Sequence, residues 1–272
     1  MVPQHLAANL DLFSGFADRY DAYRPRPPVV LLEILTQLAQ VERPRLVVDL
    51  GSGTGLSTFV WAPRAEQVVG VEPNADMRAI AESRAASTAH APNVRFVDAI
   101  SSQTGLPDAS ADIVTCSQSL HWMEPEPTFA EVIRILRPGG VFAAYDADWP
   151  PTITWQAERA FAEFVESYDK LGEQRGWYRG VMRWEKEEHL TRMQASGCFR
   201  YVKEIVVHHT EPGDAERLVG LALSQGRVAK LLQLGVSDQA ISVDEFRAVV
   251  QRELGDRSST WYFSYRVRLG IK

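Results

Sequence analysis

Over the first 150 residues of the chain, short apolar runs alternate with amphipathic stretches. Apolar runs of about four to eight residues are typical of buried strands, and five are expected, over residues 45–50, 67–71, 94–97, 111–116 and 141–146. Helices are expected over 29–39, 56–61 and 75–86, and around 129–136, before the RPGG of 137–140. In the last helix, apolar residues recur at the i, i+3, i+4, i+7 spacing. This alternation predicts βαβ units, and therefore a doubly wound parallel sheet with right-handed crossovers.

The pattern changes after Pro150 and Pro151. Residues 153–196 are helical and aromatic in character, residues 199–208 predict a strand, and two helices are expected to follow. The second of these begins with a capping box from Ser242 to Glu245. Apolar and polar residues then alternate from 261 to 269 with period two, as in an antiparallel edge strand with one wetter face.

The predicted fold is therefore an α/β seven-stranded sheet, mostly parallel, with an antiparallel last strand and a helical lid inserted after strand five. We expect one domain over 1–272, with four parts. These are N-terminal helices (1–40), a ligand-binding core (44–149), a helical and aromatic lid (150–198), and the last two strands with their helices (199–272).

Composition narrows the class of protein. The net charge of −6 argues against a nucleic-acid surface, and no apolar run approaches the roughly 20 residues of a membrane helix. The N-terminus lacks the basic-then-apolar pattern of a signal peptide. Two cysteines, Cys116 and Cys198, form neither a disulfide framework nor a metal-binding spacing. We therefore expect a cytoplasmic protein with no metal, membrane or nucleic-acid partner, and leave its oligomeric state open.

The stretch VVDLGSGTG, residues 47–55, places three glycines where a strand turns into a helix. Glycines let the backbone approach a ligand closely. A dinucleotide fingerprint would need its last glycine at position 56, where this chain has Leu56. Asp49 ends the first strand, and Glu72 and Asp98 follow the next two strands. These three acidic residues are therefore expected at the carboxyl edge of the sheet, where ligands of such sheets bind. A ribose can bind Glu72, and an exocyclic amino group can bind Asp98. The alternatives are a purely structural turn, a helix-dipole Glu and a capping Asp.

Five segments together carry a resemblance that covers roughly residues 44–148. They are VVDLGSGTG (47–55), VVGVEPNADM (68–77), VRFVDA (94–99), ADIVTCSQSLHWM (111–123) and ILRPGGVFAAYD (135–146). The chain resembles the class I S-adenosylmethionine-dependent methyltransferases of type 11, which have a Rossmann-like fold. FADRYDAYRPRPP (16–28) and the triplet at 120–122 are similar to the trans-aconitate-methyltransferase-like subgroup.

The resemblance implies S-adenosylmethionine as cofactor, S-adenosylhomocysteine as product, and a set of cofactor-binding residues. The set is Tyr20, Arg24, Asp49, Gly51, Ser52, Gly53, Thr54, Glu72, Pro73, Met77, Asp98, Ala99, Ser117 and Gln118. It implies that the glycine turn lies along the methionine part and that Asp49 holds this turn and reaches the amino group. Ser117 and Gln118 would face the methionine chain and the sulfonium. Arg24 would pair with the carboxylate and Tyr20 would close over the site; a solvated charge is the alternative for Arg24.

On the nucleoside side, the resemblance implies that Glu72 binds the ribose hydroxyls. Pro73 and Met77 would flank the adenine, and Asp98 with Ala99 would contact its edge. Aspartate accepts hydrogen bonds from exocyclic amino groups, which agrees with that position.

The acceptor is expected over the carboxyl edge of the sheet. A hydroxyl or amine acceptor needs a base, for which His121 is the candidate, whereas a carboxylate needs none. A structural histidine is the alternative. The expected substrate-binding residues are His121, Trp122, Trp149, Tyr178, Arg179 and Trp184. Arg179 and Arg183 could bind an acidic substrate. The alternatives are that the rings pack the added helices and that these two arginines are solvated.

The sequence therefore predicts an enzyme that transfers a methyl group from S-adenosylmethionine to a small molecule, with a carboxylate or hydroxyl as acceptor. The alternative is a protein that binds the cofactor and transfers no methyl group. A nicotinamide oxidoreductase is disfavoured by Leu56 and Asp98.

Overall fold

The computed structural model describes residues 4–15, 17–88, 91–236 and 242–272; Phe16, in the N-terminal motif, lies outside them. Seven strands form one sheet in the order β3-β2-β1-β4-β5-β7-β6. The strands are β1 (Leu46–Leu50), β2 (Gln67–Val71), β3 (Val94–Val97), β4 (Ala111–Ser117), β5 (Leu136–Ala147), β6 (Tyr201–Gly213) and β7 (Ser259–Ile271). The five strands predicted in the first half are thus confirmed.

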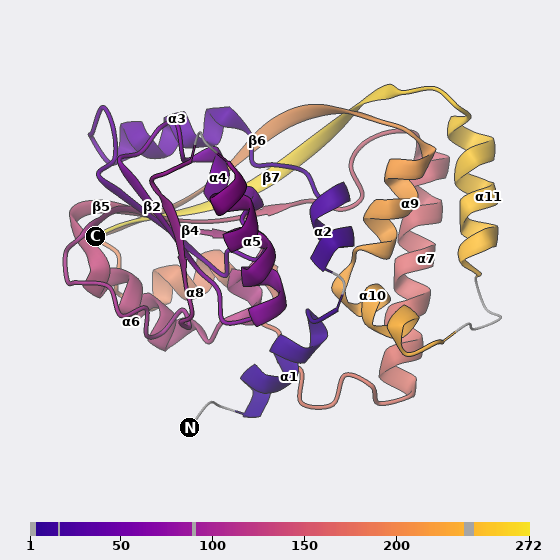
Figure 1. Cartoon of the computed structure of the whole chain (residues 1–272), viewed down its shortest axis with the longest axis horizontal. Helices are drawn as coiled ribbons and strands as arrows, with labels where there is room; N and C mark the ends of the chain where they lie inside the picture. The colour runs from indigo at the N-terminus through magenta and orange to yellow at the C-terminus, as the bar shows by residue number, and fades with distance from the viewer. Residues whose placement is uncertain (1–3, 16, 89–90, 237–241) are drawn as a thin grey trace. The chain divides into compact units, whose positions relative to one another are not determined.

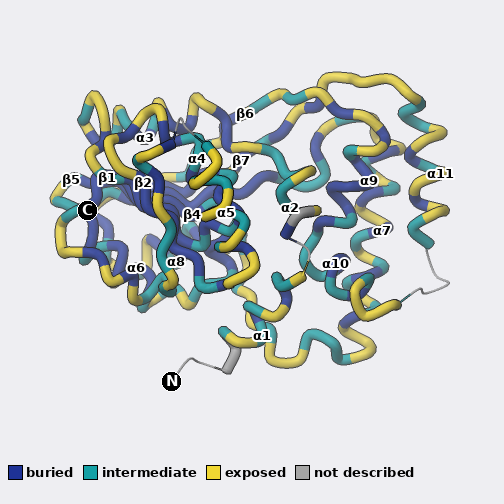
Figure 2. Tube along the Cα trace, viewed as in Figure 1, coloured by how far each residue is buried: buried dark blue, intermediate teal, exposed yellow. Residues whose placement is uncertain are grey.

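Strands β1 to β5 pair in parallel, as predicted. Successive residues of each strand face opposite sides of the sheet, yet Val47 and Val48 of β1 are both fully buried, as are Val68 and Val69 of β2. Both faces are therefore covered, as expected for a parallel sheet. Figure 2 shows β1, β2 and β4 in the dark blue of buried residues.

Strand β7 runs antiparallel to β5, from Val141 opposite Ile271 to Ala147 opposite Tyr265. Its direction is as predicted, but its place is not, because β7 lies between β5 and β6 and is no edge strand. Its wetter face is accordingly buried at Arg268, which is only 3% exposed. Ion pairs across that face compensate the buried charge of this arginine.

The helices agree with the predicted pattern in most places. They are α1 (Gln4–Leu12), α2 (Ala17–Tyr23), α3 (Val29–Leu38), α4 (Leu56–Val60), α5 (Ala75–Ser87), α6 (Pro125–Ile135), α7 (Trp155–Gln174), α8 (His189–Ala195), α9 (Ala215–Leu223), α10 (Gly226–Gln233) and α11 (Val243–Leu254), with single turns η1 (Leu120–Trp122) and η2 (Lys186–Glu188). Two predictions were wrong. Leu136 leaves α6 for β5, because it pairs with Ala111 of β4. Among the described residues, three helices and not two separate β6 from β7, since Gly226 starts a new helix.

The chain divides into two compact units. The sheet unit comprises Arg26–Ala147, Arg183–Val207 and Tyr265–Lys272; the helical unit comprises Met1–Pro25, Asp148–Met182 and His208–Ser264. In the helical unit, α7, α9, α10 and α11 pack beside one another (Figure 1), and the rings of Phe164 and Phe246 stack 4.3 Å apart. Residues 183–198 of the predicted lid belong to the sheet unit; the lid role itself stays a prediction.

One face of the sheet is covered within the sheet unit by α6 and α8. Phe129, Val132 and Ile135 of α6 and Met193 of α8 join residues of four strands in one core cluster. The loops that leave the carboxyl ends of β1, β2 and β4 begin directly above this core. Within the described part of the chain, no helix has the length and apolarity needed to cross a membrane.

The predicted capping box of α11 is present: Ser242 accepts a hydrogen bond from the Glu245 amide at 2.9 Å, and Glu245 accepts one from the Ser242 amide. We expect Ser242→Ala to lower the free energy of unfolding by about 1 kcal/mol, because the amide loses its partner. Urea denaturation measures this. The exposed Ser258→Ala is the control, with an expected change within about 0.5 kcal/mol; equal effects of the two substitutions would contradict a role for the cap.

Candidate functional site

The glycine turn connects β1 to α4 at the carboxyl edge of the sheet. Gly51, Gly53 and Gly55 all have left-handed backbone, with φ of 65°, 56° and 87°. At Gly51 a Cβ would also lie 2.7 Å from Ser119 and Met123, whereas at Gly53 it would meet nothing within 4 Å. Conformation alone thus requires a glycine at position 53, and this part of the turn borders open space.

Glu72 closes the turn from the neighbouring strand. Its Oε2 accepts the amide hydrogen of Gly53 at 2.8 Å, and its Oε1 accepts that of Asn74, also at 2.8 Å. Burial raises the pKa of Glu72 to about 7, although these two hydrogen bonds and the charge of Arg78 oppose the rise. The carboxyl group therefore ties the glycine turn to the loop after β2 and keeps further acceptor sites on both oxygens.

Asp49 is fully buried at the end of β1. Its two oxygens accept hydrogen bonds from Thr58 of α4 at 2.8 Å and from Thr115 of β4 at 2.9 Å. Burial raises the pKa of Asp49 to about 6. Asp49 thus joins the start of α4 to two strands, which agrees with the predicted role of holding the turn. A contact between Asp49 and a ligand stays a prediction.

The residues predicted for the adenine side lie along the β2–α5 loop and after β3. Met77 is buried, and its amide donates to the capping Asn74 at 3.0 Å. Asp98 is exposed, and its carboxylate lies 3.1 Å from Nη2 of Arg78. Arg78 also donates to the carbonyl oxygen of Glu72 at 2.8 Å. One arginine therefore links the two predicted ligand-binding acids.

On the methionine side, the predicted residues follow the carboxyl ends of β1 and β4. Ser52 is 7% exposed, and its hydroxyl has no hydrogen-bond partner among the described residues. Thr54 is buried within the turn, between Gly53 and Gly55. Gln118 follows Ser117 with a φ of 56°, and its side-chain oxygen accepts from Lys186 at 3.1 Å.

Three predicted residues meet in the helical unit. The guanidinium of Arg24 lies 4.8 Å from the ring centre of Tyr20 and 5.0 Å from that of Trp149. It also donates to Ser224 and Gln225 at 3.0–3.2 Å. A solvated Arg24 is therefore wrong, whereas its binding of a carboxylate stays a prediction. Two further predicted residues lie in this unit: Tyr178 lies under Arg227, with 4.6 Å from guanidinium to ring centre, and Arg179 is exposed.

His121 lies in η1, after β4, and is buried. Its ring centre is 4.9 Å from that of Trp122, and its carbonyl oxygen accepts the amide hydrogen of Trp184 at 2.9 Å. Asp146 of β5 lies 3.6 Å from Nδ1 of His121, measured to Oδ1. The structure therefore brings together three residues predicted for the acceptor site, namely His121, Trp122 and Trp184.

Sequence reasoning missed two residues of this neighbourhood, Lys186 and His189. The Lys186 ammonium lies 2.7 Å from Asp146 Oδ1, and His189 is 1% exposed. The only local signal was the i, i+4 spacing of His189 and Met193, both buried on one side of α8. That spacing marks a core face and does not reveal which side chains it meets.

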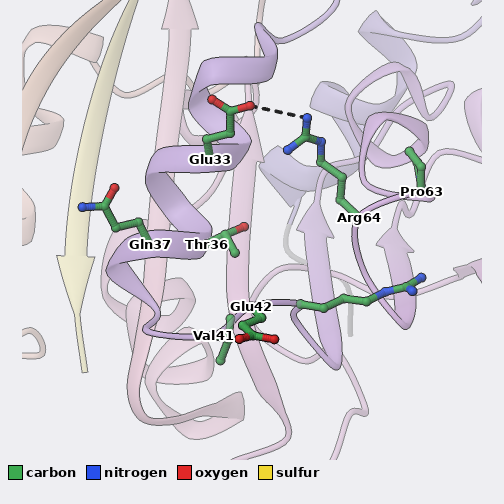
Figure 3. Close-up of a pocket in the computed structure, with 8 residues that line it drawn as sticks. Glu33, Thr36, Gln37, Val41, Glu42, Pro63 and Arg64 are labelled. Carbon is green, nitrogen blue, oxygen red and sulfur yellow. Dashed lines mark hydrogen bonds and ion pairs between the residues drawn. The ribbon is translucent and has the colours of Figure 1, made fainter.

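A cavity of about 460 Å³ lies at the opposite edge of the sheet (Figure 3). It is lined by α3 and by the segments that precede β1 and β2, including Arg43 and Pro63. Glu33 and Arg64 form an ion pair at 3.5 Å beside it. Because these segments lead into the amino ends of the strands, this cavity is distinct from the predicted site.

The raised pKa values give a pH dependence of stability. A carboxyl group with a folded pKa above its unfolded value stabilises the fold in its protonated form. For Glu72, the free energy of unfolding therefore falls as pH rises from 4.5 to about 7. We expect Glu72→Gln to reduce the fall between pH 4.5 and 7.5 by roughly 2–3 kcal/mol, at about 1.4 kcal/mol per pKa unit. Urea denaturation at both pH values measures it, with the exposed Glu66→Gln as control; equal falls in both variants would contradict the shift.

The comparisons with known proteins agree with this geometry. The family described as "Methyltransferase domain" matches residues 48–144. A probable S-adenosylmethionine-dependent methyltransferase of Saccharomyces cerevisiae is 30% identical over 155 residues, covering 56% of this chain and 53% of that protein. A malonyl-[acyl-carrier protein] O-methyltransferase of Marinomonas is 30% identical over 147 residues, covering 52% and 53%. The chain thus spans about half the length of the curated relatives it matches.

A solved structure from Anaeromyxobacter dehalogenans, titled as that of a "Putative Type II Methyltransferase", shares the fold over most of the chain. Its TM-score is 0.64 at 21% identity, and the match covers 92% of this chain and 98% of that one. The family match over residues 48–144 includes Gly51, Gly53, Glu72 and Asp98, and it ends within β5, before Asp146. The match of residues 48–144 to the methyltransferase domain family, together with these relatives, supports a class I S-adenosylmethionine-dependent methyltransferase of type 11.

Proposed function

We propose that the chain binds S-adenosylmethionine at the carboxyl edge of the sheet and transfers its methyl group to a small-molecule acceptor. The observation that carries this proposal is the geometry of the glycine turn. Its buried Ser52 hydroxyl lacks a partner in the described residues, and the neighbouring Glu72 keeps free lone pairs. The match of residues 48–144 to the methyltransferase domain family supports the same reaction.

The residues fit the cofactor. A buried hydroxyl without a partner costs free energy that a ligand hydrogen bond recovers, so Ser52 suits the methionine part. The carboxylate of Glu72 holds the turn with one lone pair on each oxygen and can accept from two ribose hydroxyls with the others. Met77 offers an apolar side chain to the adenine, and Asp98 offers an acceptor to its amino group.

When bound, the cofactor supplies a methyl group that a positive sulfur already activates. The chain's own residues then have to hold the acceptor in line and exclude water. Such positioning can lower the barrier by roughly 7–11 kcal/mol. Trp122 and Trp184, which both contact His121, are proposed to shape the acceptor site. Roles in acceptor binding for Trp149, Tyr178 and Arg179 stay predictions.

The acceptor is proposed to be a small molecule with a carboxylate or a hydroxyl group. The Marinomonas relative is named an O-methyltransferase, which supports transfer to oxygen. We further infer a cytoplasmic location, supported by the free thiols of Cys116 and Cys198. The net charge of −6 supports the absence of a nucleic-acid partner.

A chain that binds the cofactor without transferring its methyl group is the second candidate. The two are separated by incubating the protein with S-adenosylmethionine and a panel of small carboxylic acids, phenols, alcohols and amines. Release of S-adenosylhomocysteine that requires a panel member supports transfer, whereas cofactor binding without any such release supports the second candidate.

Ser52→Ala separates cofactor binding from folding. Because the hydroxyl has no partner in the described residues, we expect the free energy of unfolding to stay the same or rise slightly. The affinity for S-adenosylhomocysteine should fall about 3–10-fold, the equivalent of one hydrogen bond of roughly 0.5–1.5 kcal/mol. Calorimetric titration and urea denaturation measure the two effects; unchanged affinity would remove Ser52 from the site.

We expect Glu72→Ala to lower the affinity for S-adenosylhomocysteine at least about 100-fold, since two hydrogen bonds to a carboxylate contribute roughly 3–6 kcal/mol. Asp98→Ala should lower this affinity about 10-fold or more, because one charged hydrogen bond is lost. The control is Glu82→Ala, an exposed acid that also pairs with Arg78. Calorimetric affinities within twofold of the unsubstituted chain for both Glu72→Ala and Asp98→Ala would overturn the site.

A further inference from the structure

Arg78, which no sequence motif marks, contacts both of the acids proposed for the nucleoside. It is the fourth residue of α5. Its Nη1 donates to the carbonyl oxygen of Glu72 at 2.8 Å, and its Nη2 lies 3.1 Å from Oδ2 of Asp98. One planar guanidinium therefore connects the residue that follows β2 to the residue that follows β3.

Glu72 and Asp98 occupy equivalent positions on neighbouring strands. Strands β2 and β3 pair in parallel up to Val71 opposite Val97, so the next residue along each strand is one of the two acids. The amide of Glu72 also donates to the carbonyl oxygen of Val97 at 3.1 Å. The two acids thus leave the sheet at the same level, and Arg78 contacts each of them.

The two members of the ion pair differ in exposure. The side chain of Asp98 is 69% exposed, whereas that of Arg78 is 16% exposed. An exposed side chain samples several rotamers unless a contact restrains it, and among the described residues Arg78 is the one partner of Asp98. Arg78 is therefore the anchored member of the pair, and Asp98 is the member that it positions. Because Nη2 bonds Oδ2, the other carboxylate oxygen keeps its lone pairs for a ligand.

Local helix preferences do not account for an arginine at this place. The helix dipole favours acids near the N-terminus, where α5 has Asp76, and offers nothing to a cation there. The i, i+4 pair of Arg78 with Glu82 is 3.6 Å long and has the arginine on the N-terminal side, which is the weaker order. The shorter contacts of Arg78 are those to Glu72 and Asp98.

The chemistry of a fixed carboxylate makes it selective. A carboxylate only accepts hydrogen bonds. The exocyclic amino group of adenine donates them, whereas the oxygen that replaces this group in hypoxanthine accepts them. A carboxylate held in one position therefore attracts the first base and repels the oxygen of the second. A carboxylate that is free to rotate turns away from that oxygen and discriminates less.

We propose that Arg78 is a positioning residue: it holds Asp98 in place and thereby makes the site select an amino-bearing purine over its deaminated counterpart. This inference rests on the proposed function, which places the nucleoside beside Asp98. Arg78 itself contacts no ligand and acts through Asp98. Its bond to the carbonyl oxygen of Glu72 fixes the distance between Asp98 and the acid proposed for the ribose.

The test compares S-adenosylhomocysteine with S-inosylhomocysteine, in which hypoxanthine replaces adenine. Calorimetric titration of the full chain gives the ratio of the two affinities. For the unsubstituted chain we expect a ratio of at least about 10 in favour of adenine, because two acceptors face each other in the hypoxanthine complex. Arg78→Met should lower this ratio at least about threefold. A purely structural arginine would weaken both probes equally and leave the ratio unchanged.

Arg95→Met is the matched control. Arg95 is an exposed residue of β3, three positions before Asp98, so the control makes the same substitution and the same change of net charge nearby. Its ratio should stay within twofold of that of the unsubstituted chain. An equal fall in the ratio for Arg95→Met and Arg78→Met would attribute the effect to net charge and overturn the proposal.

A double-substitution cycle tests whether Arg78 acts through Asp98. Asp98→Asn places an amide that can donate to the hypoxanthine oxygen, so it should lower the ratio by itself. Adding Arg78→Met to Asp98→Asn should then change the ratio less than twofold, because no carboxylate remains to be positioned. A further threefold fall in the double variant would show that Arg78 acts independently of Asp98 and would overturn the proposal.

Should Arg78→Met fail to fold, Arg78→Lys provides the second variant. Lysine keeps the charge but lacks the planar fork that donates to two oxygens at once, so the ratio should fall at least about twofold. The proposal is overturned by an unchanged ratio in the variant that folds, or by equal affinities of the two probes for the unsubstituted chain. Absence of binding of both probes would contradict the proposed function itself, and this inference with it.

Discussion

The buried carboxyl group of Glu72 holds two loops in one arrangement, and the rest of the proposed ligand-binding edge depends on it. It accepts amide hydrogens from Gly53 and, within its own loop, from Asn74, so the glycine turn and the loop after β2 cannot separate without losing the bond to Gly53. Its pKa of about 7 shows that burial of this charge is costly. Such a cost is maintained where a site needs an acceptor in a fixed place.

The edge of the sheet carries several carboxyl groups, and each has a different kind of partner. They are Asp49 with threonine hydroxyls, Glu72 with backbone amides, Asp98 with an arginine, and Asp146 with a lysine and an arginine. Hydroxyls and amides stabilise a negative charge without neutralising it, whereas Lys186 and Arg268 balance that of Asp146. The chain can therefore place acids of different character within one small region, since environment and not residue type sets their behaviour.

Much of the fold followed from local patterns. Short apolar runs predicted β1 to β5, because a strand buried on both faces has few polar positions. The glycines and acids that follow these strands predict a cofactor site at the carboxyl edge, and that site stays a prediction. Contacts between residues far apart in the sequence could not be predicted from these local patterns. The alternation in β7 suggested an edge strand, because nothing local shows that Glu204 and Asp146 cover the face of Arg268. Lys186 and His189 were missed for the same reason, because they lie near Asp146 in space but more than 35 residues after it in the sequence.

The insertion of β7 between β5 and β6 also affects how the protein folds. Asp146 and Arg268 are 122 positions apart in the sequence. Helices α7 to α11 and strand β6 all lie between them along the chain. Closing so long a loop is slow, and until it closes β5 has an unpaired edge, a surface on which strands of other chains can assemble. Asp146 also lacks one of its two cations during that interval. The pairing that completes the sheet thus also brings Arg268 to Asp146, so a chain trapped before this step would be both aggregation-prone and without this ion pair.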